Sequence, residues 1–178
     1  MGAIEAQIAL LEEAINIERK GYRFSTEAAE KASDSQARDI LRELASDEQY
    51  HEQTLEEQRQ ALQTRGAFDL EAARKAADRS QGRPRPSIIP AGRSKEAAIA
   101  RASGDELRAL EVGMETERRS YDFYQRAAEQ VQEPPVERLY RSLADWENGH
   151  YLALQEMHEF LADPEAWYAR QEKPIYEG

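Results

Sequence analysis

The sequence of 178 residues contains no cysteine. Disulfide bonds, thiolate zinc sites and cysteine-bound iron–sulfur clusters are therefore excluded. Glycine and proline are also scarce, with nine and seven residues. The remaining composition is rich in Ala, Glu, Leu and Arg, which favours helices over sheets. We therefore expect an all-α protein, and the length suits a single domain over residues 1–178.

Long apolar runs and an excess of positive charge are missing as well. No apolar stretch approaches the ~20 residues that span a bilayer, and the N-terminus lacks the basic-then-apolar order of a signal peptide. The net charge of -11 argues against nucleic acid, because binding to phosphates needs a basic face. We therefore expect a cytoplasmic protein with neither a membrane nor a nucleic-acid partner.

Apolar residues recur at steps of three and four in four long segments, which is the spacing of bundle helices. In the first segment the core-facing stripe includes Ile4 and Tyr22. A polar turn around Ser33 separates the first two segments, and Ser103 to Glu106 has the form of a capping box. A connection as long as the one in the middle of the chain is unusual unless it crosses the length of a bundle. We predict helices over 1–32, 34–65, 104–132 and 134–162, a crossover over 66–102 with a short helix over 69–79, and a short helix and irregular tail over 163–178.

The two halves of the chain repeat each other at a constant offset of 99 residues. Glu18 matches Glu117, and the same offset relates Glu48 to Glu147 and His51 to His150; apolar positions such as Leu55 and Leu154 match as well. The repeat predicts two similar helical hairpins packed as a pseudo-symmetric pair.

Four Glu and two His residues fall within the apolar stripes, where Glu is rarely found unless it is paired or bound to a metal. The second helix of each hairpin carries Glu-x-x-His, whose two side chains share one helix face. Each lone Glu lies as far before its turn as the partner Glu lies after it, so all of these side chains should converge in the middle of the bundle. Such a donor set suits two Fe or Mn ions, although Glu and His could instead satisfy each other in a buried polar network. The predicted metal ligands are Glu18, Glu48, His51, Glu117, Glu147 and His150.

On these motifs, the sequence from Ile4 to Leu161 resembles the rubrerythrin branch of the ferritin-like superfamily. The resemblance implies the ferritin-like four-helix fold, the six ligands, and two metal ions, most often Fe, with Mn or mixed Mn/Fe left open. It also implies a Tyr near the metals seven residues after the lone Glu; Tyr124 fits this position, whereas the first helix has Ser25 there. Two features depart from the family: the four-cysteine rubredoxin-like site is absent, and Ser120 stands where many relatives have an additional Glu.

The resemblance implies an oxidoreductase of the peroxidase or oxidase type, which takes H2O2 or O2 as its oxidant and needs an external electron donor. Two alternatives stay open: an iron-handling protein with ferroxidase or storage activity, and a structural or binding bundle stabilised by its metals or free of them. We also expect a homodimer, in which the crossover could be exchanged between chains. Trp146 we interpret as a packing residue off the ligand stripe, and His158 as a surface residue.

Overall fold

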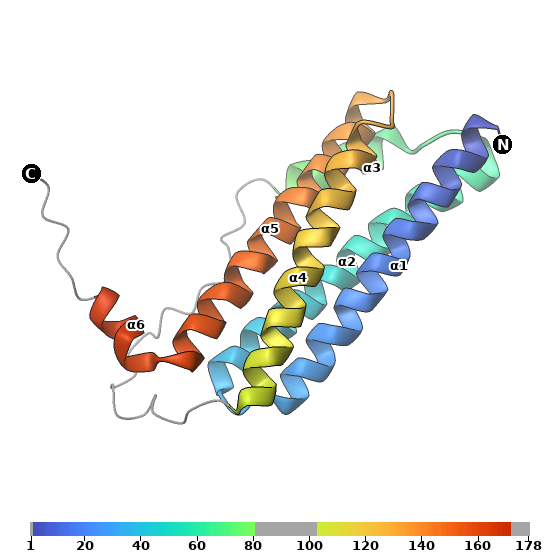
Figure 1. Cartoon of the computed structure of the whole chain (residues 1–178). Coiled ribbons are helices and arrows are strands. Elements are labelled where there is room, and N and C mark those ends of the chain that lie inside the picture. The colour runs from blue at the N-terminus through green and yellow to red at the C-terminus, as the bar shows by residue number, and fades with distance from the viewer. Residues whose placement is uncertain (1, 81–102, 172–178) are drawn as a thin grey trace, which may run out of the picture.

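The computed structural model describes residues 2–80 and 103–171, and these residues form six helices and no strand (Figure 1). The predicted all-α bundle is therefore confirmed. The linker-like part of the predicted crossover, over 81–102, and the tail over 172–178 lie outside the described residues. The helices are α1 (Ala3–Lys31), α2 (Ser35–Arg65), α3 (Leu70–Ser80), α4 (Gly104–Ala128), α5 (Pro134–Ala162) and α6 (Pro164–Gln171).

Several helix ends are set by residues that satisfy free backbone groups. The Asp34 carboxylate accepts hydrogen bonds from the backbone N–H groups of Gln36 and Ala37, at 2.8 and 3.0 Å, and so caps the start of α2. Gly66 ends α2 in the left-handed region at φ 67°, a conformation that favours glycine. Pro134 opens α5 in the first turn, where its missing N–H costs nothing.

The predicted capping box at the start of α4 forms only in part. The Ser103 hydroxyl accepts a hydrogen bond from the backbone N–H of Glu106 at 3.1 Å, as the box requires. The Glu106 carboxylate instead accepts hydrogen bonds from Ser33, from the backbone N–H at 3.1 Å and from the hydroxyl at 2.9 Å. The start of α4 is thereby tied to the turn between α1 and α2. The predicted helix over 104–132 also ends earlier, at Ala128.

Helices α1 and α2 form one antiparallel hairpin and α4 and α5 form another, and the two hairpins pack side by side (Figure 1). The short α3, predicted within the crossover, packs against the first half of α5 through Ala73 and Ala76, which belong to the same core as Leu139. This arrangement directs the inner faces of all four long helices toward one interior.

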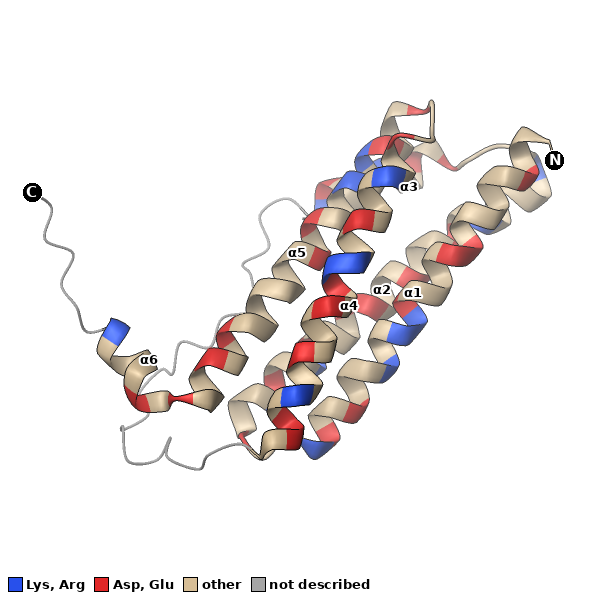
Figure 2. Ribbon diagram, viewed as in Figure 1, with Lys and Arg blue, Asp and Glu red and all other residues tan. Residues whose placement is uncertain are grey.

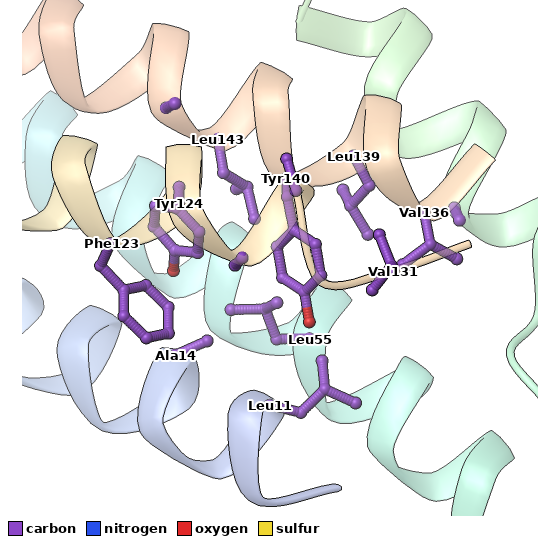
Figure 3. Close-up of a cluster of buried hydrophobic side chains, with 14 of the residues drawn as sticks. Leu11, Ala14, Leu55, Phe123, Tyr124, Val131, Val136, Leu139, Tyr140 and Leu143 are labelled. Atoms are coloured by element: carbon purple, nitrogen blue, oxygen red, sulfur yellow. The ribbon is translucent and has the colours of Figure 1, made fainter. Parts of the chain in front are cut away.

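The apolar core is divided into two clusters. One contains Leu11, Leu55, Tyr124 and Leu139, and it fills the end of the bundle shown in Figure 3. The other contains Leu41, Leu110, Leu154 and Phe160 toward the opposite end. Along each long helix, the predicted ligand positions fall between the residues of the two clusters. The polar site is therefore sealed by apolar packing on both sides.

Two predicted core positions in α1 are wrong. Ile4 is 43 % exposed and Tyr22 is 38 % exposed. The buried positions of α1 near the site are instead Glu18, Gly21 and Ser25. The small residues Gly21 and Ser25 allow the helices to approach closely. The buried face of α1 therefore includes residues that an apolar pattern does not identify.

Charged residues occur along all six helices (Figure 2), and several exposed basic side chains pair with nearby acidic ones. The Lys75 amino group lies 2.7 Å from Glu71, and Arg19 of α1 reaches across to Glu52 of α2 at 2.6 Å. Such exposed pairs stabilise the fold only modestly, by roughly 0–1 kcal/mol each. None of the helices in residues 2–80 and 103–171 combines the length and the apolar character that a membrane-spanning helix needs.

Candidate metal centre

The structure brings all six predicted ligands together in the middle of the bundle. Each side chain comes from its predicted helix, and none of the six residues is more than 2 % exposed. Helices α1 and α4 each contribute the lone Glu, and α2 and α5 each contribute Glu-x-x-His. Their role as metal ligands remains a prediction, but their convergence is now a structural fact.

One half of the cluster surrounds His51 of α2. Its Nδ1 atom lies 3.2 Å from Oε2 of Glu18, 3.5 Å from Oε2 of Glu48 and 3.8 Å from Oε1 of Glu147. These four residues can each offer one donor atom within 4.8 Å of the others. Two carboxylates of the hairpin α1–α2 and one from α5 thus face a single imidazole nitrogen.

The other half surrounds His150 of α5. Its Nδ1 atom lies 3.4 Å from Oε1 of Glu48 and 3.9 Å from Oε2 of Glu117. Together with Glu147 these residues form a second group of four donors with the same spacing. Glu48 and Glu147 belong to both groups, which is the arrangement that two ions joined by bridging carboxylates require.

Burial makes this concentration of carboxylates costly without a cation. Burial raises the pKa of Glu48 well above its usual range, and the Glu147 carboxylate raises it further. The pKa of Glu147 is likewise raised well above its usual range, first by burial and then by the charges of Glu18 and Glu117. Burial also raises the pKa of Glu117, although His150 partly opposes it. Two divalent ions would offset this repulsion and release the retained protons.

Glu18 behaves differently from the other carboxyl groups. Burial alone would raise its pKa, but the neighbouring His51 and hydrogen bonds outweigh burial, and the pKa of Glu18 is lowered. One of these bonds comes from the Tyr124 hydroxyl, which donates to Oε1 of Glu18. Tyr124 is fully buried and stacks at 6.2 Å on Tyr140 in the core (Figure 3). The structure thus places Tyr124 next to the site, as the family resemblance implied, where it contacts a predicted ligand.

A buried network in which Glu and His satisfy each other is the alternative to metal binding. Among the residues that the structure describes, however, several inward-facing atoms have no hydrogen-bond partner, including Nδ1 of His150, Oε1 of Glu117 and Oε1 of Glu147. A self-sufficient network would pair these atoms, since buried polar atoms without partners are rare in folded proteins. The donor set therefore fits two metal ions better than it fits a closed polar network.

Two residues beside the imidazoles were missed by sequence reasoning or given a lesser role. Asp47 is 3 % exposed, and its Oδ2 lies 3.6 Å from Nε2 of His150. Trp146 packs edge-on against His51, with ring centroids 5.2 Å apart, and also lies 6.0 Å from His150. Position 47 precedes the Glu of one Glu-x-x-His motif and position 146 precedes the Glu of the other. That shared place beside the motif could have identified both.

The outer candidates lie apart from the cluster. His158 pairs with Glu111, at 3.4 Å between Nε2 and Oε1, and its side chain is 25 % exposed. Ser120 is buried in α4, and its hydroxyl donates to the backbone carbonyl of Thr116 at 3.1 Å. Neither residue provides a further ligand to the cluster.

A four-helix bundle whose hairpins supply one Glu and one Glu-x-x-His each defines the ferritin-like class of di-metal carboxylate proteins. The sequence model of one family within this class, Rubrerythrin, matches residues 9–158. The chain therefore belongs to the rubrerythrin family, and both the family and the buried cluster fit a di-metal centre. No curated protein and no solved structure matches the chain.

Proposed function

We propose that this protein is a di-iron oxidoreductase that reduces H2O2 or O2 with electrons from an external donor. The observation that supports the proposal is the convergence of two Glu-x-x-His motifs and two lone Glu residues in one buried cluster. Carboxylate-rich sites with some imidazole suit iron and manganese. When bound, iron would supply redox electrons at this position; the residues described above supply its binding and its surroundings.

In this proposal the six residues divide into two shared donors and two pairs that each serve one position. Glu48 and Glu147 would offer donor atoms to both ions, because only they belong to both donor groups. Glu18 and His51 would complete one position, and Glu117 and His150 the other. Tyr124 orients the Glu18 carboxylate through its hydrogen bond.

Burial limits the reactants to small molecules. Because no ligand is more than 2 % exposed, a bulky substrate cannot reach the site without opening the bundle, whereas H2O2 and O2 are small enough to diffuse through a packed interior. Reduction of H2O2 to two water molecules consumes two electrons and two protons. The O–O bond would break and both oxygens would leave as water; the two protons would come from the solvent, and bound iron would supply the two electrons, which the external donor would replace.

The external donor follows from the composition of the chain. Without cysteine, these 178 residues hold no rubredoxin-like iron site that could deliver electrons to the cluster. Ser120 has no carboxylate that could exchange with a His ligand during turnover. Its hydroxyl, moreover, is hydrogen-bonded within its own helix. The proposed reaction therefore proceeds with a fixed set of six ligands.

Stopped-flow mixing of the Fe(II)-loaded protein with H2O2 tests the proposal. We expect a fast rise in near-UV absorbance that is much faster than the oxidation of free Fe(II). The test variant is Glu117→Ala, and its matched control is Glu111→Ala. Both positions lie on α4, but Glu111 is exposed and outside the cluster. Only the Glu117 variant should lose the fast phase.

Two results would count against the proposal. A native rate equal to that of free Fe(II) would remove the oxidoreductase function. Uptake of iron far beyond about two ions per chain, in a large assembly on size exclusion, would favour iron storage instead.

A further inference from the structure

The two halves of the metal centre are not equivalent, although the helices that build them repeat. The offset of 99 residues relates every predicted ligand of one half to a ligand of the same type in the other. The same offset relates Asp47 to Trp146 and Ser25 to Tyr124. The repeat is therefore broken at the residues that contact the ligands rather than at the ligands themselves.

The first difference between the two halves concerns the side chain that packs against each imidazole. In both His residues Nδ1 faces the carboxylates, which leaves Nε2 on the outer side. Nε2 of His150 faces the Asp47 carboxylate at 3.6 Å, so a shift of roughly 0.5 Å would form a hydrogen bond. The ring that packs edge-on against His51 is Trp146, with ring centroids 5.2 Å apart, and an indole has no lone pair with which to accept an N–H.

A carboxylate behind a ligating imidazole strengthens it as a ligand. It fixes the tautomer in which Nε2 carries the proton and Nδ1 offers its lone pair to the metal, holds the ring orientation and raises the basicity of the donor atom. Asp47 is 3 % exposed, so water competes little for this interaction. Among residues 2–80 and 103–171, Nε2 has no hydrogen-bond partner in either imidazole, but only Nε2 of His150 has a carboxylate close enough to become one.

The second break concerns the lone Glu residues and acts in the same direction. Glu18 accepts a hydrogen bond from Tyr124, which draws charge away from its carboxylate. The equivalent residue in the repeat, Ser25, donates no such bond to Glu117, because its hydroxyl has no hydrogen-bond partner among residues 2–80 and 103–171. The half with the stronger imidazole thus also has the lone Glu that accepts no hydrogen bond from a tyrosine.

We propose that the two metal positions fill in order, with the position of Glu117 and His150 filled first, and that Asp47 is the positioning residue that sets this order. The inference rests on the proposed di-metal site and adds to it the inequivalence of the two halves. Asp47 acts through His150 and is not itself a ligand. The position of Glu18 and His51 is then the weaker one, from which a metal ion leaves more readily.

Titration of the metal-free protein with Co(II) under argon tests this order. Visible absorption and calorimetry should resolve two binding steps in the native protein. In Asp47→Asn we expect the affinity of the tighter step to fall about 10–100-fold, while the weaker step stays unchanged. Asp39→Asn makes the same chemical change on α2 at a side chain that is 74 % exposed, and should alter neither step.

A second measurement uses the native protein and does not depend on the folding of a variant. Crystals grown with one equivalent of Co(II) should show a stronger anomalous peak beside Nδ1 of His150 than beside Nδ1 of His51. Equal peaks, or a stronger peak at His51, would overturn the proposed order while leaving the di-metal site intact. The same holds if Asp47→Asn weakens both steps equally or neither. A protein that binds no Co(II) at all would overturn this proposal and the proposed function together.

Discussion

Replacement of Glu147 by glutamine separates two effects of the buried carboxylates on stability: the cost of burying their charge in the metal-free protein and the gain from metal binding. The amide has the shape of the carboxyl group but cannot ionise, and the residue belongs to both donor groups. In the metal-free protein, burial and the charges of Glu18 and Glu117 raise the pKa of Glu147 well above 4.5. The metal-free protein should therefore tolerate Glu147→Gln, whereas metal binding should not.

The sign for the metal-free protein follows from linkage. A carboxyl group whose pKa is raised by folding contributes no penalty below its unfolded pKa of about 4.5, and stability is lost as pH rises toward the folded pKa. Within that range the loss from one such group approaches about 1.4 kcal/mol per pH unit. Glutamine has no such dependence, so metal-free Glu147→Gln should be more stable than the metal-free native protein at pH 7.

The metal-bound protein should show the opposite ranking. At a free metal concentration of 100 times Kd, binding to one site stabilises the fold by about 2.7 kcal/mol, which raises Tm by roughly 5–11 °C for a chain of this size. If the substitution weakens that site about 100-fold, the gain falls to about 0.4 kcal/mol and the rise in Tm to about 1 °C.

Differential scanning calorimetry with and without Mn(II) measures both effects on the same samples. Glu137→Gln is the matched control, because Glu137 lies on α5 outside the cluster, with a side chain that is 40 % exposed and pairs with Arg141 at 2.9 Å. The reasoning is refuted if Glu147→Gln keeps the native metal-induced rise in Tm, or if its metal-free form is clearly less stable than the native protein at pH 7.

Three further outcomes are expected. Tyr124→Phe removes the hydrogen bond to buried Glu18 and should cost the metal-free protein about 1–3 kcal/mol in urea denaturation; an unchanged midpoint would contradict the contact. Gly21→Ala should lower Mn(II) affinity in calorimetry without unfolding the protein, because a Cβ there would lie 2.7 Å from Oε1 of Glu48; native affinity would show that Glu48 adapts freely. Since metal binding displaces protons from Glu48 and Glu147, whose pKa values are raised, the metal-induced rise in Tm should be larger at pH 7.5 than at pH 5.5; a smaller rise at pH 7.5 would contradict proton displacement.

The convergence of the six residues could be predicted because it depends on spacing alone. Glu18 and Glu48 are equally distant from the turn at Ser33, and an antiparallel hairpin must bring such residues to one level. The repeat then applies the same rule to Glu117 and Glu147. Helical period and turn position are local properties, and the apolar pattern reports both.

The residues around the site could not be predicted in the same way. Asp47 lies on α2 but contacts His150 on α5, so its role depends on how the two hairpins are placed against each other. An apolar pattern also misses Gly21, which is buried because its small size leaves room for Glu48. The same effect explains the error at Tyr22. The buried face of α1 contains the small residues Gly21 and Ser25, whereas the Tyr22 side chain beside them is partly exposed.

The contact between Glu106 and Ser33 shows a further limit. Sequence alone paired Glu106 with Ser103 in a capping box, because both lie within one turn of a helix. In the folded chain, the turn between α1 and α2 provides two hydrogen-bond donors for the same carboxylate, the backbone N–H and the hydroxyl of Ser33. A local motif therefore loses its partner when tertiary packing supplies another.

Elemental analysis of the protein purified without added metal tests the central claim most directly. We expect about two metal ions per chain, with iron as the main element, and their loss in the double variant Glu48→Ala/Glu147→Ala, which removes both shared carboxylates. A native protein that retains no metal, or a double variant that retains as much metal as the native protein, would contradict the assignment of this cluster as a di-metal centre.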